Sequence, residues 1–250
     1  MRVAVVTGAS SGIGRAAAMR LARDGAVLAV ARQDSALAEV CDAIRSAGGT
    51  AERIACDVTA ADAPCAIVAR ALEAFGGIDV LVNAAGIIAS GAVSATTDDG
   101  WDTMMDVNVR APFRLIREAA DALVARRGAV VNVSSVAGTR AFPGLASYCV
   151  SKAAIDQLTR VAALDFAPHQ VRVNAVNPGV VVTNLHRRGG MDERRYAEFL
   201  EKSRTTHPLG RAGTPEEIAD LIAFLASPQA GWITGETISI DGGRHLTCLR

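Results

Sequence analysis

The sequence lacks an excess of charge of either sign. Its 26 lysine and arginine residues balance 26 aspartate and glutamate residues, and no long block of one sign occurs. Proteins that bind nucleic acid or an anionic membrane through their overall field need a basic patch or stripe, which this pattern does not provide. We therefore expect a small-molecule partner, with no nucleic acid and no membrane.

Long hydrophobic runs are also missing. No apolar stretch reaches the roughly 18 residues that a bilayer-spanning helix needs. The opening run, MRVAVVTG, is too short and too quickly interrupted for a secretory signal. These absences predict a cytoplasmic location.

The cysteines and histidines show no metal-binding spacing. There is no CxxC pair, and no histidine stands near a cysteine at zinc-ligand spacing. We expect most cysteines to be reduced, small, buried hydrophobic residues, and we predict no metal site. The residues concerned are Cys41, Cys56, Cys65, Cys149 and Cys248, with His169, His186, His207 and His245.

Short apolar runs rich in valine recur along the 250 residues, half of which are hydrophobic. They are nearly continuous rather than alternating, which is typical of parallel strands buried on both faces. Six of them can be recognised: RVAVVTG, VLAVAR, DVLVNAAG, GAVVNVSS, VRVNAVNPG and ETISIDGG.

Alanine-rich segments with helical periodicity separate these runs. They cover Arg15 to Arg23, Leu37 to Ala47, Ala61 to Phe75 and Phe113 to Arg126. Alternating strands and helices predict an α/β fold with right-handed crossovers, doubly wound, in which ligands bind at the carboxyl ends of the strands. We expect one Rossmann-type domain, residues 1–250, with a mostly parallel sheet of about seven strands.

Residues 177–210 interrupt this alternation. An irregular loop leads into a charged helix near Glu193 to Ser203, which is followed by Pro208. An excursion of this length beyond a strand end is often a lid or a binding loop. We predict a helical substrate lid around residues 184–207; a mobile surface insertion is the alternative.

Three glycines, Gly8, Gly12 and Gly14, lie between the first strand and the first helix. Glycine lets the backbone turn tightly and approach a pyrophosphate, whose charge is favoured by the free amides and the dipole of a helix N-terminus. A glycine triplet is weak by itself, but its place in the first strand-turn-helix unit favours dinucleotide binding over a merely structural turn.

Tyr148 and Lys152 stand four residues apart in a segment with helical character. Residues at this spacing are neighbours on a helix surface, so the ammonium comes within electrostatic reach of the phenol. The alternative is a chance pair on a solvated face. Motifs elsewhere in the chain are needed to distinguish a chemical pair from a chance pair.

Five motifs in order supply that context: TGASSGIG at residues 7–14, NAAG at 83–86, NVSS at 132–135, YCVSK at 148–152 and NPG at 177–179. Together they resemble the short-chain dehydrogenase/reductase family, in its compact single-domain branch with TGxxxGxG and YxxxK motifs. The resemblance covers essentially the whole chain. It implies an NAD(P)-dependent oxidoreductase that acts on CH–OH or C=O groups.

The resemblance also implies a catalytic set. Tyr148 would be the general acid or base, and Lys152 would lower its pKa, together with the oxidised nicotinamide, while also binding the nicotinamide ribose. The family serine lies thirteen residues before the tyrosine, which selects Ser135, with Ser134 as the second candidate. Asn108 matches the asparagine that organises a proton path to the lysine.

Further positions would contact the dinucleotide by the same resemblance. The second asparagine of the frequent NNAG motif is Ala84 here. The implied contacts, besides Tyr148 and Lys152, are Gly8, Ser10, Ser11, Gly12, Ile13, Gly14, Arg32, Asp57, Val58, Asn83, Ala85, Gly86, Pro178, Gly179 and Thr183.

The end of the second predicted strand bears on the choice of dinucleotide. NAD use normally relies on an acidic side chain there, whereas NADP use needs a cation for the 2′-phosphate. Ala31 and Arg32 occupy this place and Asp34 lies further on, while Ser11 stands where many NADP-using relatives have a second basic residue. We therefore expect a moderate preference for NADP(H), with NAD(H) as the second option.

Two other functions stay open. A 3-oxoacyl-carrier-protein reductase would share every catalytic motif and differ only in what the lid accepts. A dinucleotide-sensing protein without turnover would have no need of the four catalytic positions. The family resemblance further implies a homo-oligomer, a homotetramer or a dimer, with residues 232–243 as an interface strand.

Overall fold

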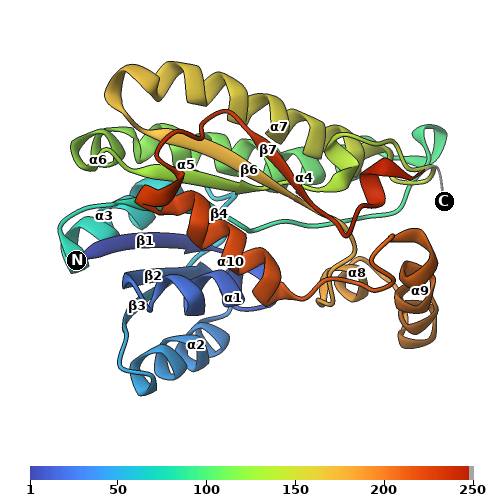
Figure 1. Cartoon of the computed structure of the whole chain (residues 1–250), viewed down its shortest axis with the longest axis horizontal. Coiled ribbons are helices and arrows are strands. Elements are labelled where there is room, and N and C mark those ends of the chain that lie inside the picture. The colour runs from blue at the N-terminus through green and yellow to red at the C-terminus, as the bar shows by residue number, and fades with distance from the viewer. Residues whose placement is uncertain (248–250) are drawn as a thin grey trace.

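Seven parallel strands form one sheet in the computed structural model, which describes residues 1–247. The strand order is β3-β2-β1-β4-β5-β6-β7, and every neighbouring pair is parallel (Figure 1). The doubly wound α/β fold predicted from the sequence is confirmed. The strands are β1 (Arg2–Thr7), β2 (Gly25–Ala31), β3 (Thr50–Ala55), β4 (Val80–Asn83), β5 (Ala129–Val133), β6 (Arg172–Pro178) and β7 (Thr237–Ile240).

Helices cover both faces of the sheet. On one face Ala18 of α1, Leu37 of α2 and Ile222 of α10 pack into a common core with alternate residues of the strands. On the other face the core is completed by α3, α5, α6 and α7, which lie together in Figure 1. The bounds are α1 (Gly12–Leu21), α2 (Asp34–Ser46), α3 (Ala63–Phe75), α5 (Ala111–Glu118), α6 (Ala120–Arg126), α7 (Ala146–Phe166) and α10 (Pro215–Ala226).

Two elements differ from what the sequence patterns indicated: one strand was not recognised, and one predicted helix is divided. Strand β3, with the sequence TAERIA, has no apolar run, because it is an edge strand whose residues are mostly half-buried or exposed. The predicted helix from Phe113 to Arg126 is two helices, α5 and α6, separated at Ala119.

Shorter elements join these layers. Helix α4 (Asp98–Met105) runs into a π-helical turn, η2 (Asp106–Arg110), and then into α5. The 3-10 turns are η1 (Val93–Ala95), η3 (Val136–Gly138), η4 (Ala167–His169), η5 (Pro228–Ala230) and η6 (Arg244–Leu246). A π-helical turn is rare and frequently marks a functional position.

Residues 184–207, predicted to form a lid and called the lid segment below, hold two helices, α8 (Leu185–Arg188) and α9 (Glu193–Thr206). The second matches the helix predicted near Glu193 to Ser203. Both lie beyond the carboxyl ends of the strands, at the side of the molecule opposite the N-terminus (Figure 1).

The strand order reverses between β1 and β4. Chain segments leaving these two neighbours turn to opposite faces of the sheet, which opens a crevice at their carboxyl ends. The glycine-rich turn follows β1 and the NAAG motif follows β4. Both predicted cofactor motifs therefore border the same crevice.

Cysteine burial differs from the expectation. Of the four described cysteines, all free, only Cys41 is buried; Cys56 and Cys149 are half-buried and Cys65 is exposed. Cys65 lies on the outward face of α3, where a small side chain meets solvent. Cys248 lies outside the described residues.

Within residues 1–247 no helix is long and apolar enough to cross a membrane. The same part of the chain holds no group of three histidine, cysteine, aspartate or glutamate side chains that could hold a metal ion.

Candidate active site

The turn after β1 can be built only with glycine. Gly8 has a φ of 67°, and a Cβ atom there would lie 2.8 Å from the carbonyl oxygen of Ala84. A Cβ atom at Gly14 would lie 2.3 Å from the carbonyl oxygen of Gly8. The turn at Gly8 therefore packs backbone to backbone against the loop after β4 and against the start of α1. We call this turn, from Gly8 to the start of α1, the cradle.

The N-terminus of α1 points into this cradle. Ser11 is the N-cap residue, yet its side chain makes no capping hydrogen bond. The first amides of α1 therefore lack a side-chain acceptor, and such amides favour an anion. Ser10 is half-buried on the turn, while Ile13 packs against the core.

Thr7 joins the cradle to the loop after β4 and was not among the predicted site residues. Its Oγ1 accepts hydrogen bonds from the backbone amides of Ala84, at 3.0 Å, and Ala85, at 3.1 Å. Thr7 is 1% exposed, so this hydroxyl fixes the spacing of the two loops from within the protein. The only signal in the sequence was its place directly before Gly8.

Asn83 belongs to a buried chain of amides. Its Nδ2 donates to Asn132 Oδ1 at 2.8 Å, and Asn132 Nδ2 donates to Thr159 Oγ1 at 2.9 Å. This chain ties β4 and β5 to α7. Asn83 Oδ1 is buried and has no hydrogen-bond partner among residues 1–247.

Asn108 lies on the π-helical turn and is clamped from both sides. Its Oδ1 accepts from the amide of Ile87 at 2.9 Å, and its Nδ2 donates to the carbonyl oxygen of Ile87 at 3.0 Å and to Ser151 Oγ at 3.0 Å. A Cβ atom at Gly86 would lie 3.4 Å from Asn108 Oδ1 and 3.7 Å from Lys152 Nζ. Gly86 thus leaves room where the asparagine and the lysine converge.

Tyr148 and Lys152 both lie on α7, on its buried side rather than on a solvated face. Their exposed fractions are 7% and 6%, and Lys152 Nζ lies 5.7 Å from the centroid of the Tyr148 ring. The ammonium donates a hydrogen bond of 2.9 Å to the carbonyl oxygen of Val133 at the end of β5. A chance surface pair is therefore ruled out by their burial.

Burial controls the titration of this pair. It raises the pKa of Tyr148 to about 12, and it lowers the pKa of Lys152 to about 8. The expected lowering of the tyrosine pKa by the lysine is therefore absent from the chain without cofactor. Removing a phenol from water disfavours its anion more strongly than the neighbouring groups favour it.

The structure separates the two candidate serines. Ser135 faces Tyr148, and hydrogen bonding between their side chains favours the ionised phenol. Ser134 turns the other way, and its Oγ donates to the carbonyl oxygen of Lys152 at 3.1 Å. Of the two hydroxyls, only that of Ser135 is placed beside the phenol.

Asp156, one turn after Lys152 on α7, is a buried carboxylate that the sequence reasoning did not single out. It is 2% exposed and accepts a hydrogen bond of 3.0 Å from Asn177 Nδ2. Burial raises its pKa, and its charge in turn favours the protonated form of Lys152.

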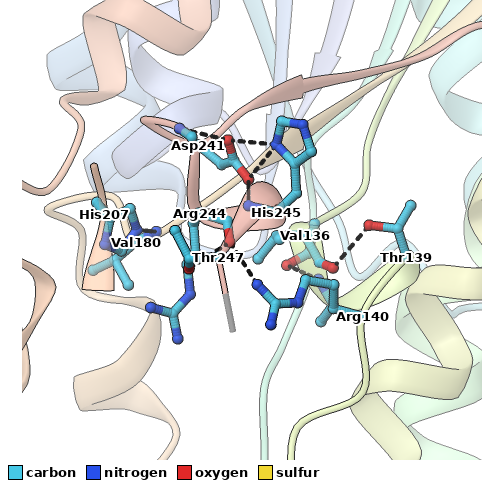
Figure 2. A network of polar contacts seen from close by, with 12 residues as sticks. Val136, Thr139, Arg140, Val180, His207, Asp241, Arg244, His245 and Thr247 are labelled. Carbon is cyan, nitrogen blue, oxygen red and sulfur yellow. Dashed lines mark hydrogen bonds and ion pairs between the residues drawn. The ribbon is translucent and has the colours of Figure 1, made fainter. Parts of the chain in front are cut away.

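His207 supports the turn after β6, which begins at Gly179, directly after Pro178. Figure 2 shows His207 beside Val180 of this turn. Its Nε2 accepts from the amide of Val180 at 3.1 Å, so Nδ1 carries the proton and donates to the carbonyl oxygen of Ser203 at 2.9 Å. Burial lowers its pKa, which favours this neutral form. The last turn of α9 is thereby attached to the turn after β6.

A second polar group in Figure 2 joins residues 241–247 to the loop after Ser135. The buried carboxylate of Asp241 accepts from the amides of Gly243 at 3.0 Å and His245 at 2.7 Å. Arg140 donates to the carbonyl oxygen of Arg244. These contacts hold residues 241–247 against the loop after Ser135, where the Arg244 guanidinium lies 5.2 Å from the centroid of the Phe142 ring.

Thr183 marks the start of the lid segment. Its amide donates to the hydroxyl of Tyr196 at 3.2 Å, and that hydroxyl donates back to the carbonyl oxygen of Thr183 at 2.9 Å. The Thr183 methyl lies 3.2 Å from where a Cβ atom of Gly12 would stand. Helix α9 thus holds Thr183 against the glycine-rich turn.

The far end of the crevice holds Arg32, Asp57 and Val58. Val58 is buried, Arg32 is exposed after the end of β2, and Asp57 Oδ1 accepts from the amide of Thr59 at 2.9 Å. Bonds from Thr59 lower the pKa of Asp57, and the nearby charge of Arg32 adds to the effect. Asp34 forms a two-point ion pair with Arg53, at 2.8 and 3.3 Å.

Known proteins resemble this chain over almost its whole length. A family model described as "Enoyl-(Acyl carrier protein) reductase" matches residues 8–245. The short-chain reductase protein NovJ of Streptomyces niveus is 43% identical over 97% of this chain and 93% of its own. The 3-oxoacyl-[acyl-carrier-protein] reductase FabG of Staphylococcus aureus is 37% identical over 97% of this chain and 98% of its own.

A crystal structure of a short-chain dehydrogenase/reductase of unknown function from Caenorhabditis elegans, solved with cofactor, superimposes with a TM-score of 0.92. It is 36% identical, and the match covers 98% of this chain and 96% of that one. The chain belongs to the short-chain dehydrogenase/reductase family, and it is an oxidoreductase of the kind that uses NAD(P)(H) to act on CH–OH or C=O groups.

Proposed function

We propose that this enzyme transfers a hydride between NADP(H) and the carbon of a carbonyl or secondary alcohol, and that Tyr148 exchanges the proton. The observation that carries the proposal is the convergence of Ser135, Tyr148, Lys152 and Asn108 beside Gly86. These side chains come from three segments of the chain, namely η2, the loop after β5 and α7, beside the crevice that the glycine-rich turn also borders.

The residues present fit a dinucleotide. Glycine at positions 8 and 14 lets the turn pack backbone to backbone beside the start of α1, and the helix offers uncapped amides to a pyrophosphate. When bound, the nicotinamide supplies or accepts the hydride. Its contacts would be Gly8, Ser10, Ser11, Gly12, Ile13, Gly14, Arg32, Asp57, Val58, Asn83, Ala85, Gly86, Tyr148, Lys152, Pro178, Gly179 and Thr183.

Charge at the end of β2 favours NADP(H) over NAD(H). Arg32 is exposed there and, in the described part of the chain, forms no ion pair with a carboxylate. Asp34 forms an ion pair with Arg53, so its carboxylate is not free to accept a hydrogen bond from a ribose hydroxyl. A cation with no committed partner suits a 2′-phosphate better than a 2′-hydroxyl.

The protonation states suit reduction of a carbonyl. With a pKa of about 12, Tyr148 carries its proton at neutral pH and can donate it to the substrate oxygen. Ser135 donates a hydrogen bond to the same oxygen. Lys152, with a pKa of about 8, is mostly charged at pH 7 and stabilises the phenolate that forms. Asn108 helps to organise the proton path that leads to this lysine.

The alternative substrate is a 3-oxoacyl group on a carrier protein. It is favoured by the similarity to the Staphylococcus aureus reductase, and the lid segment would decide between it and a free ketone. A dinucleotide-sensing role is less well supported, because a pure binder would not need a proton donor beside a serine. A homo-oligomer, a cytoplasmic location and one domain with a closing lid stay predictions.

A substrate panel tests the proposal. The purified enzyme is mixed with NADPH and with ketones, hydroxysteroids, sugars or 3-oxoacyl thioesters, and absorbance at the reduced nicotinamide band is followed. We expect NADPH oxidation with at least one carbonyl class. Tight dinucleotide binding without turnover across the panel would favour the sensing role.

The cofactor preference has its own test. Arg32→Ala should raise the KM for NADPH by about tenfold, the loss of one charge-assisted contact, and change the KM for NADH little. Arg23→Ala is the matched control, because it removes an exposed arginine that precedes β2 and lies outside the predicted cofactor contacts. A wild-type enzyme that works better with NADH would contradict the preference.

A further inference from the structure

We infer that Arg188, on helix α8 of the lid segment, binds a phosphate group of the dinucleotide and so couples the lid to the cofactor. The inference rests on the proposed dinucleotide-dependent function. Arg188 is not part of the glycine-rich turn, and none of the five sequence motifs contains it.

The contact that carries the inference joins residues 177 positions apart. Arg188 Nη1 donates a hydrogen bond of 3.1 Å to Ser11 Oγ. Ser11 is the N-cap residue of α1, so the guanidinium lies at the helix end whose amides lack a side-chain acceptor. A cation and free helix amides that face the same space form a site for an anion.

Helix α8 is held over this space at two points. At its start, Leu185 donates its amide to Thr183 Oγ1, and Thr183 lies against Gly12. Just past its end, Gly189 approaches the loop after β4, where a Cβ atom would lie 2.8 Å from the carbonyl oxygen of Ile88. The helix thus spans from the glycine-rich turn to the opposite side of the crevice.

The two neighbouring arginines of α8 have different surroundings. Arg187 is paired with Glu193, with Nη2 to Oε2 at 2.9 Å, and its guanidinium lies 3.9 Å from the centroid of the Tyr196 ring. Arg188 forms no ion pair with any carboxylate of residues 1–247; its side chain bonds only the neutral hydroxyl of Ser11. Arg187 therefore stabilises the lid segment internally, whereas the charge of Arg188 is available to a phosphate.

Two phosphate groups of the dinucleotide have this chemistry, the pyrophosphate and the adenosine 2′-phosphate. The N-terminus of α1 favours the pyrophosphate, and Arg32 at the end of β2 marks the side on which a 2′-phosphate would lie. Binding of NADPH and NADH to the same variants distinguishes them, because only NADPH carries the second group.

The test is isothermal titration of both dinucleotides into wild type, Arg188→Ala, Arg188→Lys and Arg194→Ala. Arg194 lies on α9 with its side chain 80% exposed, so it controls for the loss of one positive charge from the lid segment. We expect Arg188→Ala to raise the Kd for NADPH at least about tenfold, Arg188→Lys to raise it less, and Arg194→Ala to stay within twofold. The loss should shrink at high salt, as an ionic contact requires.

If the Kd rises for NADPH alone, the group that Arg188 binds is the 2′-phosphate. If the Kd rises equally for NADPH and NADH, the group is the pyrophosphate. Arg188→Ala within twofold of wild type for both dinucleotides would overturn the inference and leave the proposed function standing. A wild-type chain that binds neither dinucleotide would overturn both. Thermal unfolding of each variant shows that the comparison is made between folded proteins.

Discussion

Lys152 Nζ lies 5.7 Å from the centroid of the Tyr148 ring and 2.9 Å from the carbonyl oxygen of Val133. The lysine is therefore positioned by the end of a central strand, with the phenol as its neighbour rather than its hydrogen-bond partner. Because both side chains are buried, the folded chain without cofactor disfavours the phenolate and the ammonium alike. The charges of the reaction then develop in a site that is poorly solvated from the start.

The first prediction concerns pH and the stability of the cofactor-free enzyme. Burial lowers the pKa of Lys152 from 10.5 to about 8, so between these values the unfolded chain binds a proton that the folded chain does not. Stability rises with pH in such a window. The free energy of unfolding of wild type, relative to Lys152→Met, should therefore rise from pH 8 to pH 10 in urea titrations.

Lys202→Met is the matched control, because Lys202 is exposed on α9. Above pH 10 Tyr148 acts in the opposite sense: its pKa is raised from 10.0 to about 12, so the folded chain keeps a proton that the unfolded chain loses, and stability falls. A pH-independent difference between wild type and Lys152→Met from pH 8 to pH 10 would contradict the burial of a charged amine.

The second prediction is that Tyr148→Phe stops turnover without unfolding the protein. The ring and its packing against Met104 and Ala137 are kept, while the proton donor is lost. We expect kcat to fall by about 100- to 10,000-fold, the usual contribution of a general acid, with the Kd for NADPH nearly unchanged. Steady-state kinetics and titration of the dinucleotide measure the two effects separately; a near-normal kcat would remove Tyr148 from the mechanism.

The third prediction compares the adjacent serines. Ser135→Ala removes the hydroxyl that faces Tyr148, and we expect kcat to fall about 100-fold or more, as for a lost donor to a developing oxyanion. Ser134→Ala removes a bond to the Lys152 carbonyl and should cost about 1 kcal/mol of stability with a much smaller effect on kcat. The reverse order of the two kcat values would show that Ser134 is the substrate-facing residue.

The fourth prediction concerns the cradle. Gly8→Ala places a methyl group 2.8 Å from backbone atoms of Ala84 and Ala85, at a φ of 67°. Gly76→Ala is the control: its φ is 73°, but a Cβ atom there meets nothing within 4 Å. Gly76→Ala should cost about 1–2 kcal/mol from the left-handed conformation alone.

Gly8→Ala should cost clearly more and should also weaken dinucleotide binding, since the loop after β4 has to move. Chemical denaturation and titration with NADPH check both effects. Equal stabilities of the two variants would show that the close approach of the Gly8 and Ala84 loops does not require glycine at position 8.

Much of the fold follows from local patterns. Near-continuous valine-rich runs predict parallel strands because only a sheet covered on both faces buries every side chain of a strand, and five of the seven strands show that pattern. Strand β7, with the sequence TISI, is the second edge strand and alternates instead. Strand β3 could not be predicted in this way, because an edge strand has one neighbour and leaves its charged residues in solvent.

The amino-acid sequence by itself determined the fold class, the place of the glycine-rich turn and the spacing of Tyr148 and Lys152, because each depends on residues near one another in the chain. The tertiary structure decided which serine faces the phenol, how Thr7 and His207 hold the loops, and that Arg188 reaches Ser11. These contacts join segments far apart in the sequence. It also decided the direction of the Tyr148 and Lys152 pKa shifts, since burial is a property of the packed core that the spacing of two residues does not contain.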